Sequence, residues 1–495
     1  RHISCPNTTP TPALGVPHPQ GTHKGESSFS TNDTHYTAAS YLGRFFYSFR
    51  DTYMITTSFR RDGYAGFGAN NRWGNFGSLG LGWTFTNEKF MESTKDWFDN
   101  GKLRVSYGTN GNRDFGDVYK TLANLSSGGT MVYYDRNSGN SSVQNSLTMD
   151  RLASPNLEWE KTKSWNVGLD YSFLNGRIAG TIDWYAKKTT DMIMAQRLPS
   201  FTGFGSITAN LGEVQNHGIE ITVNTRNIDT ENLTWTTSAG FSYNKNEIKH
   251  IYYDYDENGV EQNDITNGWY IGHSIGEIWY YKTDGVWQNT PEDIAAAALV
   301  GQKPGDPKVV NLYTEDDKVL DDGTRVPVYN DKDKDYLGCT QPPFYWTLRN
   351  DFTFLKNFTF SFSFYSYMGH KSLSGNWLNQ DNGGSQVTNA FNVPDKNYWT
   401  PSNPTNDYCR LNAVGPNTGL AGGVSKLYNR NFVRLDNITL GYTLPQAITR
   451  KFSVEKIHLS VNCNNVLTID SWEYGDPETG GLATRNFNFG VNITL

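Results

Sequence analysis

The residues best suited to recognise a ligand are tryptophans and tyrosines that gather in two long polar segments, about residues 249–343 and 370–430. The flat face of an aromatic ring stacks on the apolar face of a sugar, and nearby amide or carboxylate groups hydrogen-bond its hydroxyls. For any single one of these rings, packing between loops or contact with a partner is the simpler explanation. The candidate binding residues are Trp269, Tyr270, Trp279, Tyr280, Trp287, Trp377, Asn379, Asp381 and Trp399.

Three aspartates have a spacing that suggests a metal site. Asp331, Asp333 and Asp335 match the first ligands of an EF-hand calcium loop. Tyr336 stands where that loop needs glycine, and Pro342 stands where it needs a bidentate glutamate. A solvated acidic loop therefore explains the pattern better. We expect no cofactor, with Ca²⁺ as the weak alternative.

Catalysis is not predicted by any group of residues. His217 enters an alternating segment, and His458 lies on the polar side of another. Neither has a serine or cysteine nucleophile motif close to it in sequence. Hydrogen bonding is the expected role of both histidines, and the chain is not expected to be an enzyme.

Composition excludes several classes of protein. The 495 residues carry a net charge of −7 and include no long run of lysine or arginine, which argues against a nucleic-acid partner. No stretch approaches the roughly 18–20 apolar residues of a membrane-spanning helix. Mean hydropathy is −0.60, yet 14% of residues are aromatic. So many aromatic residues need burial or a lipid-like surface, which disfavours disorder.

Strict alternation of apolar and polar residues is the dominant pattern. Along residues 486–495, Phe487, Phe489, Val491 and Ile493 share one face, and asparagines and Thr494 share the other. About 13 such segments are present, most of them as long as the roughly 9–11 residues of a tilted membrane strand. They are 41–50, 53–62, 73–85, 101–110, 164–174, 177–189, 218–228, 233–248, 344–355, 358–369, 431–444, 457–469 and 486–495.

The connections alternate between short and long. Asn175-Gly176 favours a type I′ hairpin turn, whereas the connections before residues 164 and 344 are long. Short turns at one end and long loops at the other are typical of an outer-membrane β-barrel in contact with lipid. A soluble β-sandwich also alternates but does not need so many long strands, and a propeller would show a regular repeat.

An odd strand number suggests that part of the barrel lies elsewhere. Bacterial barrels usually have an even number of strands, so we expect at least one strand before residue 40. Residues 1–39 lack periodicity and are expected to form an irregular extracellular segment or the remnant of a loop. Residues 40–495 are expected to form the C-terminal portion of the barrel.

Several blocks, in order, resemble the SusC/RagA-type TonB-dependent transporters. They run from about residue 40 to the end of the chain. The blocks are 41–50, 53–63, 71–74, 154–160 with Thr162 and Trp165, 212–220, 432–445, 464–468 and 476–478.

This resemblance implies an all-β transmembrane antiparallel barrel of about 22 strands, of which this chain supplies about 13, without the plug domain. It implies active uptake of oligosaccharides or peptides, a SusD-like surface lipoprotein as a lid, and energy from the TonB complex through an N-terminal region that is missing here. The alternative from a different class is a passive porin or a surface-adhesion barrel without energy coupling.

Overall fold

In a computed structural model, the alternating segments of the chain form one antiparallel sheet. The structure describes residues 2–4, 30–32, 35–113, 116–134, 136, 139–378, 396–420 and 424–495. Thirteen strands form the sheet, and each pairs with the next sheet strand along the chain. In chain order they are β3 (Ala38–Phe49), β4 (Tyr53–Tyr64), β5 (Trp73–Thr84), β6 (Phe98–Asn112), β9 (Glu160–Phe173), β10 (Ile178–Arg197), β11 (Ser206–Asp229), β12 (Leu233–His250), β19 (Phe344–Phe354), β20 (Phe358–Met368), β23 (Phe432–Thr443), β24 (Lys456–Asp470) and β25 (Asn486–Thr494).

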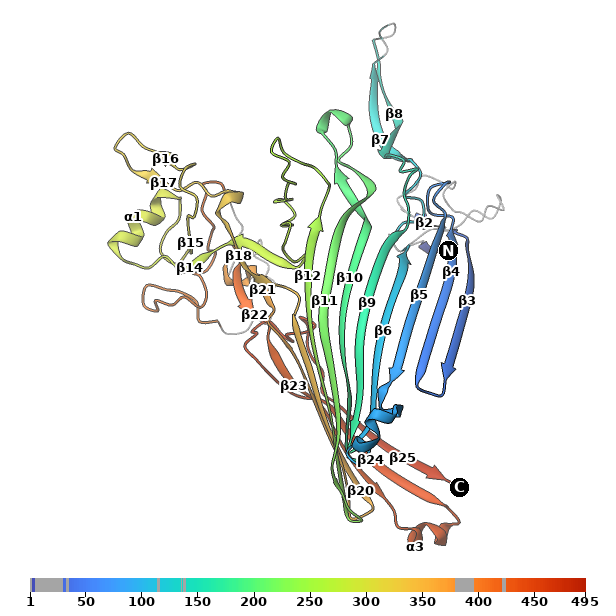
Figure 1. The fold of residues 1–495 in the computed structure, drawn as a ribbon. Helices are drawn as coiled ribbons and strands as arrows, with labels where there is room; N and C mark the ends of the chain where they lie inside the picture. Colours follow the sequence, from blue (N-terminus) through green and yellow to red (C-terminus); the bar gives the residue numbers. More distant parts are fainter. Residues whose placement is uncertain are drawn as a thin grey trace, which may run out of the picture.

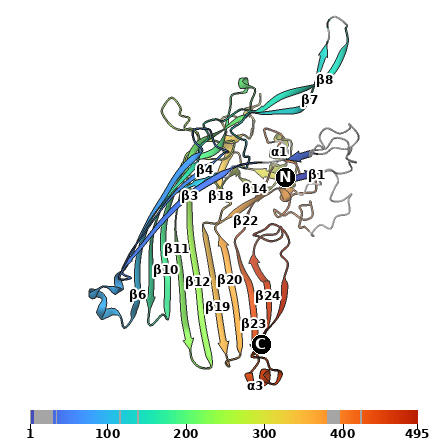
Figure 2. The ribbon, with the colours of Figure 1, turned by 90° about the vertical axis from the view of Figure 1, so that its right-hand side faces the viewer.

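The sheet curves into a wall with short turns at one end and long loops at the other (Figures 1 and 2). Strands β3 and β25 are its two edges, so the chain forms part of a barrel. All thirteen predicted strands are present. At the turn between β9 and β10, Asn175 and Gly176 have φ of 58° and 74°, as the predicted type I′ turn requires.

The loop end differs from the sequence prediction in two places. The connection expected over residues 190–217 is mostly strand, because β10 and β11 leave only residues 198–205 between them. The connection between β6 and β9 contains an unpredicted hairpin, β7 (Asn124–Tyr134) with β8 (Ser141–Arg151). These segments project beyond the wall in Figure 1. Water on both faces removes the need for an apolar side, so alternation no longer marks the strand.

The N-terminal segment is less irregular than expected in its described parts. Strands β1 (His2–Ser4) and β2 (Ser30–Asn32) pair with each other, and β3 already begins at Ala38. Elsewhere, the connection between β5 and β6 contains a 3-10 helix over Lys89–Thr94. None of the helices in the described part of the chain is long and apolar enough to cross a membrane.

Each sheet strand has an apolar face and a polar face. On the apolar face, Leu81, Trp165, Phe241 and Val461 are exposed, as expected for a surface in contact with lipid. On the polar face, the Arg104 guanidinium bridges Asp170 at 2.7 Å and Asp183 at 3.0 Å across three strands. The apolar face therefore corresponds to the outside of a barrel, and the polar face to its lumen.

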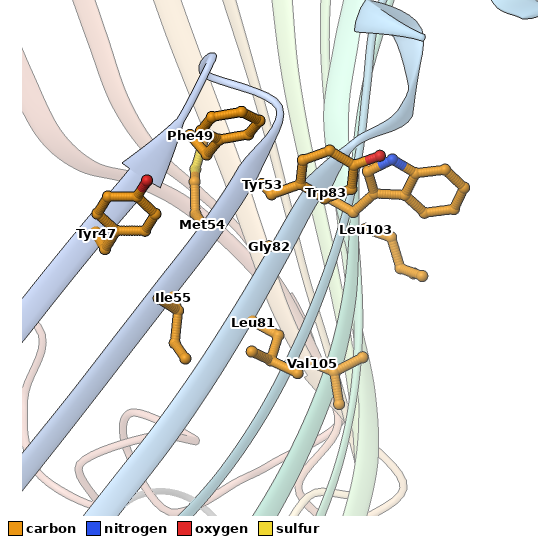
Figure 3. A pocket seen from close by; sticks show the side chains of 10 residues that line it. All are labelled: Tyr47, Phe49, Tyr53, Met54, Ile55, Leu81, Gly82, Trp83, Leu103 and Val105. Atoms are coloured by element: carbon orange, nitrogen blue, oxygen red, sulfur yellow. The ribbon is translucent and has the colours of Figure 1, made fainter.

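The apolar face carries a hollow near the short turns (Figure 3). Its volume is about 460 Å³. At its rim, the Tyr53 hydroxyl and the Trp83 indole N–H both donate to the Glu88 carboxylate. Rings with an apolar body and a polar tip mark the membrane–water interface, so the short turns lie at one border of the apolar band. The lining residues are Tyr47, Phe49, Tyr53, Met54, Ile55, Leu81, Gly82, Trp83, Leu103 and Val105.

Gly212 marks the point where β11 leaves the regular ladder. Its φ is 76°, and a bulge follows at Glu213 and Val214. A Cβ at this position would lie 2.8 Å from the Met194 sulfur and 3.2 Å from the Ile251 carbonyl oxygen. Glycine is therefore needed both for its conformation and for the close approach of the chain.

Replacing Gly212 by alanine is expected to destabilise the upper part of β10–β12 by about 2–4 kcal/mol, from the left-handed backbone and the steric overlap together. Hydrogen exchange of residues 206–250 in the intact protein measures this loss of stability. Gly268→Ala is the matched control, because Gly268 also has positive φ (70°) but no atom within 4 Å of its Cβ position. Equal effects of the two substitutions would refute the steric part.

Candidate functional site: the extracellular loop subdomain

The two long insertions fold together into a small subdomain beyond the wall. The first contributes β13 (Glu277–Tyr281), β14 (Thr283–Val286), α1 (Pro291–Leu299), β15 (Pro307–Val309), β16 (Lys318–Val319), β17 (Arg325–Val326) and β18 (Lys334–Cys339), and the second contributes β21 (Lys371–Ser374) and β22 (Lys426–Asn429). Their shared core contains residues from both insertions, among them Tyr281, Val309, Trp377 and Val424. The loops therefore form a packed surface with a core of its own.

Three of the predicted binding tryptophans are buried, and two of them, Trp377 and Trp399, belong to this core. Trp377 is 0% exposed, Trp399 is 6% exposed and Trp287 is 7% exposed. Their indole N–H groups donate to the Asn406 carbonyl oxygen, to Gln288 and to Gln302, respectively. No ring face of Trp377 is open to a ligand in this structure. Burial within the loop subdomain covers these three rings, so they are not available to stack on a ligand in this structure.

The remaining predicted aromatic residues are partly exposed. Trp269 packs against the cluster of Val214, Ile248 and Ile251 at the top of the wall. Tyr280 packs against the loop core. Asn379 and Asp381 lie outside the described residues.

Tyr270 and Trp279 form an aromatic platform with Tyr336, which is not among the predicted binding residues. The ring centroids of Tyr270 and Trp279 are 4.0 Å apart, and those of Trp279 and Tyr336 are 5.9 Å apart. Tyr336 is 49% exposed. The Glu277 carboxylate accepts the Trp279 indole N–H at 3.0 Å, which fixes the indole ring. The pairing of β13 with β18 places Tyr336 opposite Trp279, and the sequence alone carries no signal for that pairing.

The phenols of this platform remain hydrogen-bond donors at neutral pH. Burial and the negative charge of Asp331 raise the pKa of Tyr270. Burial and the negative charge of Glu277 raise the pKa of Tyr336. Partly exposed rings next to carboxylates can stack on a sugar and hydrogen-bond its hydroxyls.

The three aspartates of the EF-hand-like spacing do not converge. Asp333 is fully buried, and its carboxylate accepts the backbone N–H groups of Leu312, Tyr313 and Asn330. Asp331 pairs with Lys334 at 2.8 Å. Across the described residues, no three acidic, histidine or cysteine side chains are grouped to hold a metal ion. Asp333 instead holds two loop segments together.

An ionic cluster fixes the last long loop, residues 471–485, to the wall. Arg434, on the polar side of β23, binds Asp476 and also Glu478 at 3.2 Å, the Tyr365 hydroxyl at 3.1 Å and Thr468 at 3.1 Å. Burial tends to raise the pKa of Asp476, but backbone N–H groups of Thr479 and Glu478 and the Arg434 charge outweigh it and hold the pKa below its usual value. The resembling block 476–478 is thus a structural anchor.

Comparisons with known proteins now identify the family. The family model described as "TonB dependent receptor-like, beta-barrel" matches residues 6–466. The chain belongs to this family. As a TonB-dependent receptor-like barrel of the SusC/RagA type, it is an outer-membrane protein that crosses the membrane with its strands.

Curated relatives of this TonB-dependent receptor-like chain are receptors. TonB-dependent receptor P3 of Formosa agariphila is 29% identical over 506 residues, covering 96% of this chain and 47% of the relative. TonB-dependent receptor SusC of Bacteroides thetaiotaomicron is 29% identical over 466 residues, covering 90% and 42%. The chain thus spans less than half the length of these relatives. Both relatives are named as TonB-dependent receptors.

A solved structure supports the same fold. The chain matches a structure of the RagAB peptide transporter with a TM-score of 0.73 and 23% identity, covering 98% of this chain and 50% of the other. The thirteen strands therefore form a wall of the kind found in that larger barrel.

Proposed function

We propose that the protein containing this chain imports oligosaccharides across the outer membrane, with energy from TonB and a SusD-like lipoprotein as a lid over the loop subdomain. The observation that carries the proposal is similarity to SusC over 90% of the chain. The partly exposed platform of Tyr270, Trp279 and Tyr336 supplies ring faces suited to sugars. Peptides are the second candidate, because the fold matches that of the RagAB peptide transporter.

Substituting Trp279 and Tyr336 together by alanine is expected to weaken oligosaccharide binding about tenfold or more, since two stacking faces are lost. The measurement is calorimetric titration of the intact transporter–lid complex with a panel of oligosaccharides. Tyr255→Ala is the matched control, because Tyr255 is 51% exposed on the same insertion but lies outside the platform. Unchanged affinity of the double variant would remove the platform from the proposal.

Two further results distinguish the alternatives. If peptides bind the complex and no oligosaccharide does, the sugar proposal fails while import remains. If uptake by intact cells continues after the proton gradient is collapsed, the passive-porin alternative replaces energised import. Collapse of uptake together with the gradient is the expected result.

A further inference from the structure

The apolar face of the wall ends in aromatic side chains at its upper border, toward the long loops. Trp165 on β9, Trp184 on β10 and Tyr243 on β12 share this face, and Tyr107 lies 4.8 Å from Trp165 between ring centroids. From Trp165 to Phe173, β9 supplies nine residues, at the lower end of the roughly 9–11 that a tilted strand needs to cross the membrane. These rings mark the outer membrane–water interface.

Basic side chains on the same face begin directly above these aromatic residues. Lys163 is the next residue above Trp165 on the same face of β9, and it lies opposite Lys188 on β10. His217 on β11 lies opposite Lys245 on β12, next above Tyr243. Like charges directly opposite each other destabilise a sheet. The Lys163–Lys188 pairing therefore favours a further counter-charge at Lys163, since Glu213 neutralises Lys188 alone. We name Lys163, Lys188, His217 and Lys245 the basic patch.

Carboxylates near the basic patch are already paired. Glu213 binds Lys188 at 2.7 Å, and Glu247 binds Lys249. Asp191 and Glu158 each bind Lys161 at 3.2 Å. In the described part of the chain, Lys163 and Lys245 have no carboxylate within ion-pair distance, and both are exposed. The two lysines lie three strands apart, roughly 14 Å.

We propose that the basic patch binds the phosphate groups of a glycolipid in the outer leaflet. The height of the patch relative to the membrane is the observation that favours a lipid ligand. Its lysines lie one or two outward-facing positions above the interfacial rings, which is the level of lipid headgroups. Basic side chains at this level attract anionic lipid. The lipid-facing direction of the patch also separates it from the lumen and from the aromatic platform.

The test compares lipid binding by the intact detergent-purified transporter and by a K163Q/K188Q/K245Q variant. Monophosphoryl lipid A is the probe, its dephosphorylated form is the chemical control, and native mass spectrometry counts bound lipid. We expect the variant to bind the phosphorylated lipid at least about tenfold more weakly. Binding to the parent is expected to fall at high salt, and the dephosphorylated lipid is expected to bind weakly to both proteins.

A K120Q/K303Q/K318Q variant is the matched control, because it removes three loop lysines and leaves the basic patch intact. The folded fraction of each variant is checked by its heat-dependent mobility in gels. Equal retention of lipid by parent and patch variant overturns the proposal. Retention of the dephosphorylated lipid by the parent also overturns it, as does displacement of the lipid by millimolar inorganic phosphate. If the patch variant does not fold, the proposal is tested on the parent protein alone. Its lipid binding must then fall at high salt and must require the phosphate group of the lipid.

Discussion

Replacing Arg434 by methionine is expected to release the loop of residues 471–485 from the wall. Arg434 is 4% exposed and Asp476 is 5% exposed, so the substitution leaves a buried carboxylate without its cation. Breaking a buried pair in this way costs about 3–5 kcal/mol. The hydrogen bonds from Arg434 to Tyr365 and Thr468 are lost as well.

Hydrogen–deuterium exchange of the intact protein measures this release. Residues 471–485 are expected to lose protection, while the paired amides of β19 and β20 keep theirs. Arg226→Met is the matched control, because the Arg226–Asp229 pair is half-exposed on both sides. Exposed pairs contribute only about 0–1 kcal/mol. A double variant, R434M/D476L, is expected to recover part of the protection, since the fully buried unpaired charge is gone and the remaining partner, Glu478, is partly exposed. Parental exchange in R434M would contradict the anchor.

The strands were predictable from sequence because the membrane imposes their pattern. Between the two aromatic borders, one face of each strand meets lipid and the other meets water, so residues such as Trp165 to Phe173 alternate strictly. Above the border that constraint ends. The upper part of β11 contains Gly212 and a bulge, and its outward positions are polar, so the sequence there does not distinguish strand from loop.

The anchor of the last loop was only half visible in sequence. Residues 476–478 stood out as a block, and Arg434 lies on the polar side of a predicted strand. Their pairing depends on the three-dimensional route of the loop after β24, which folds back over β23 and β20. The sequence alone therefore gives no signal of which carboxylate Arg434 will contact.

The loop aromatics show the same limit. Trp377 and Trp279 are both tryptophans in polar loops, and sequence gives no reason to separate them. The fold separates them because the second insertion packs Trp377 against Cys409 and Val424 in the loop core. Trp279 instead stacks beside Tyr270 at the base of the subdomain. Burial thus decides which aromatic residue supports the loops and which can meet a ligand.

Trp377→Ala is accordingly expected to destabilise the loop subdomain by about 3–5 kcal/mol, the usual cost of emptying a buried tryptophan site. The ring has no exposed surface, its indole N–H donates to the Asn406 carbonyl oxygen, and the Lys426 ammonium lies 5.6 Å from its centroid. Limited proteolysis of the intact protein is expected to cut within residues 369–431 much faster than in the parent.

Trp279→Ala provides the contrast that separates a core role from a ligand role. Because Trp279 is only partly buried, its loss should leave protease resistance near the parental value and weaken oligosaccharide binding directly. In Trp377→Ala, binding should fall only as far as the loops become cleavable, and the wall should remain folded because its strands pair independently of the loop core. If Trp377→Ala loses binding while its loops resist protease, Trp377 itself contacts the ligand, and the loop core must open to admit it.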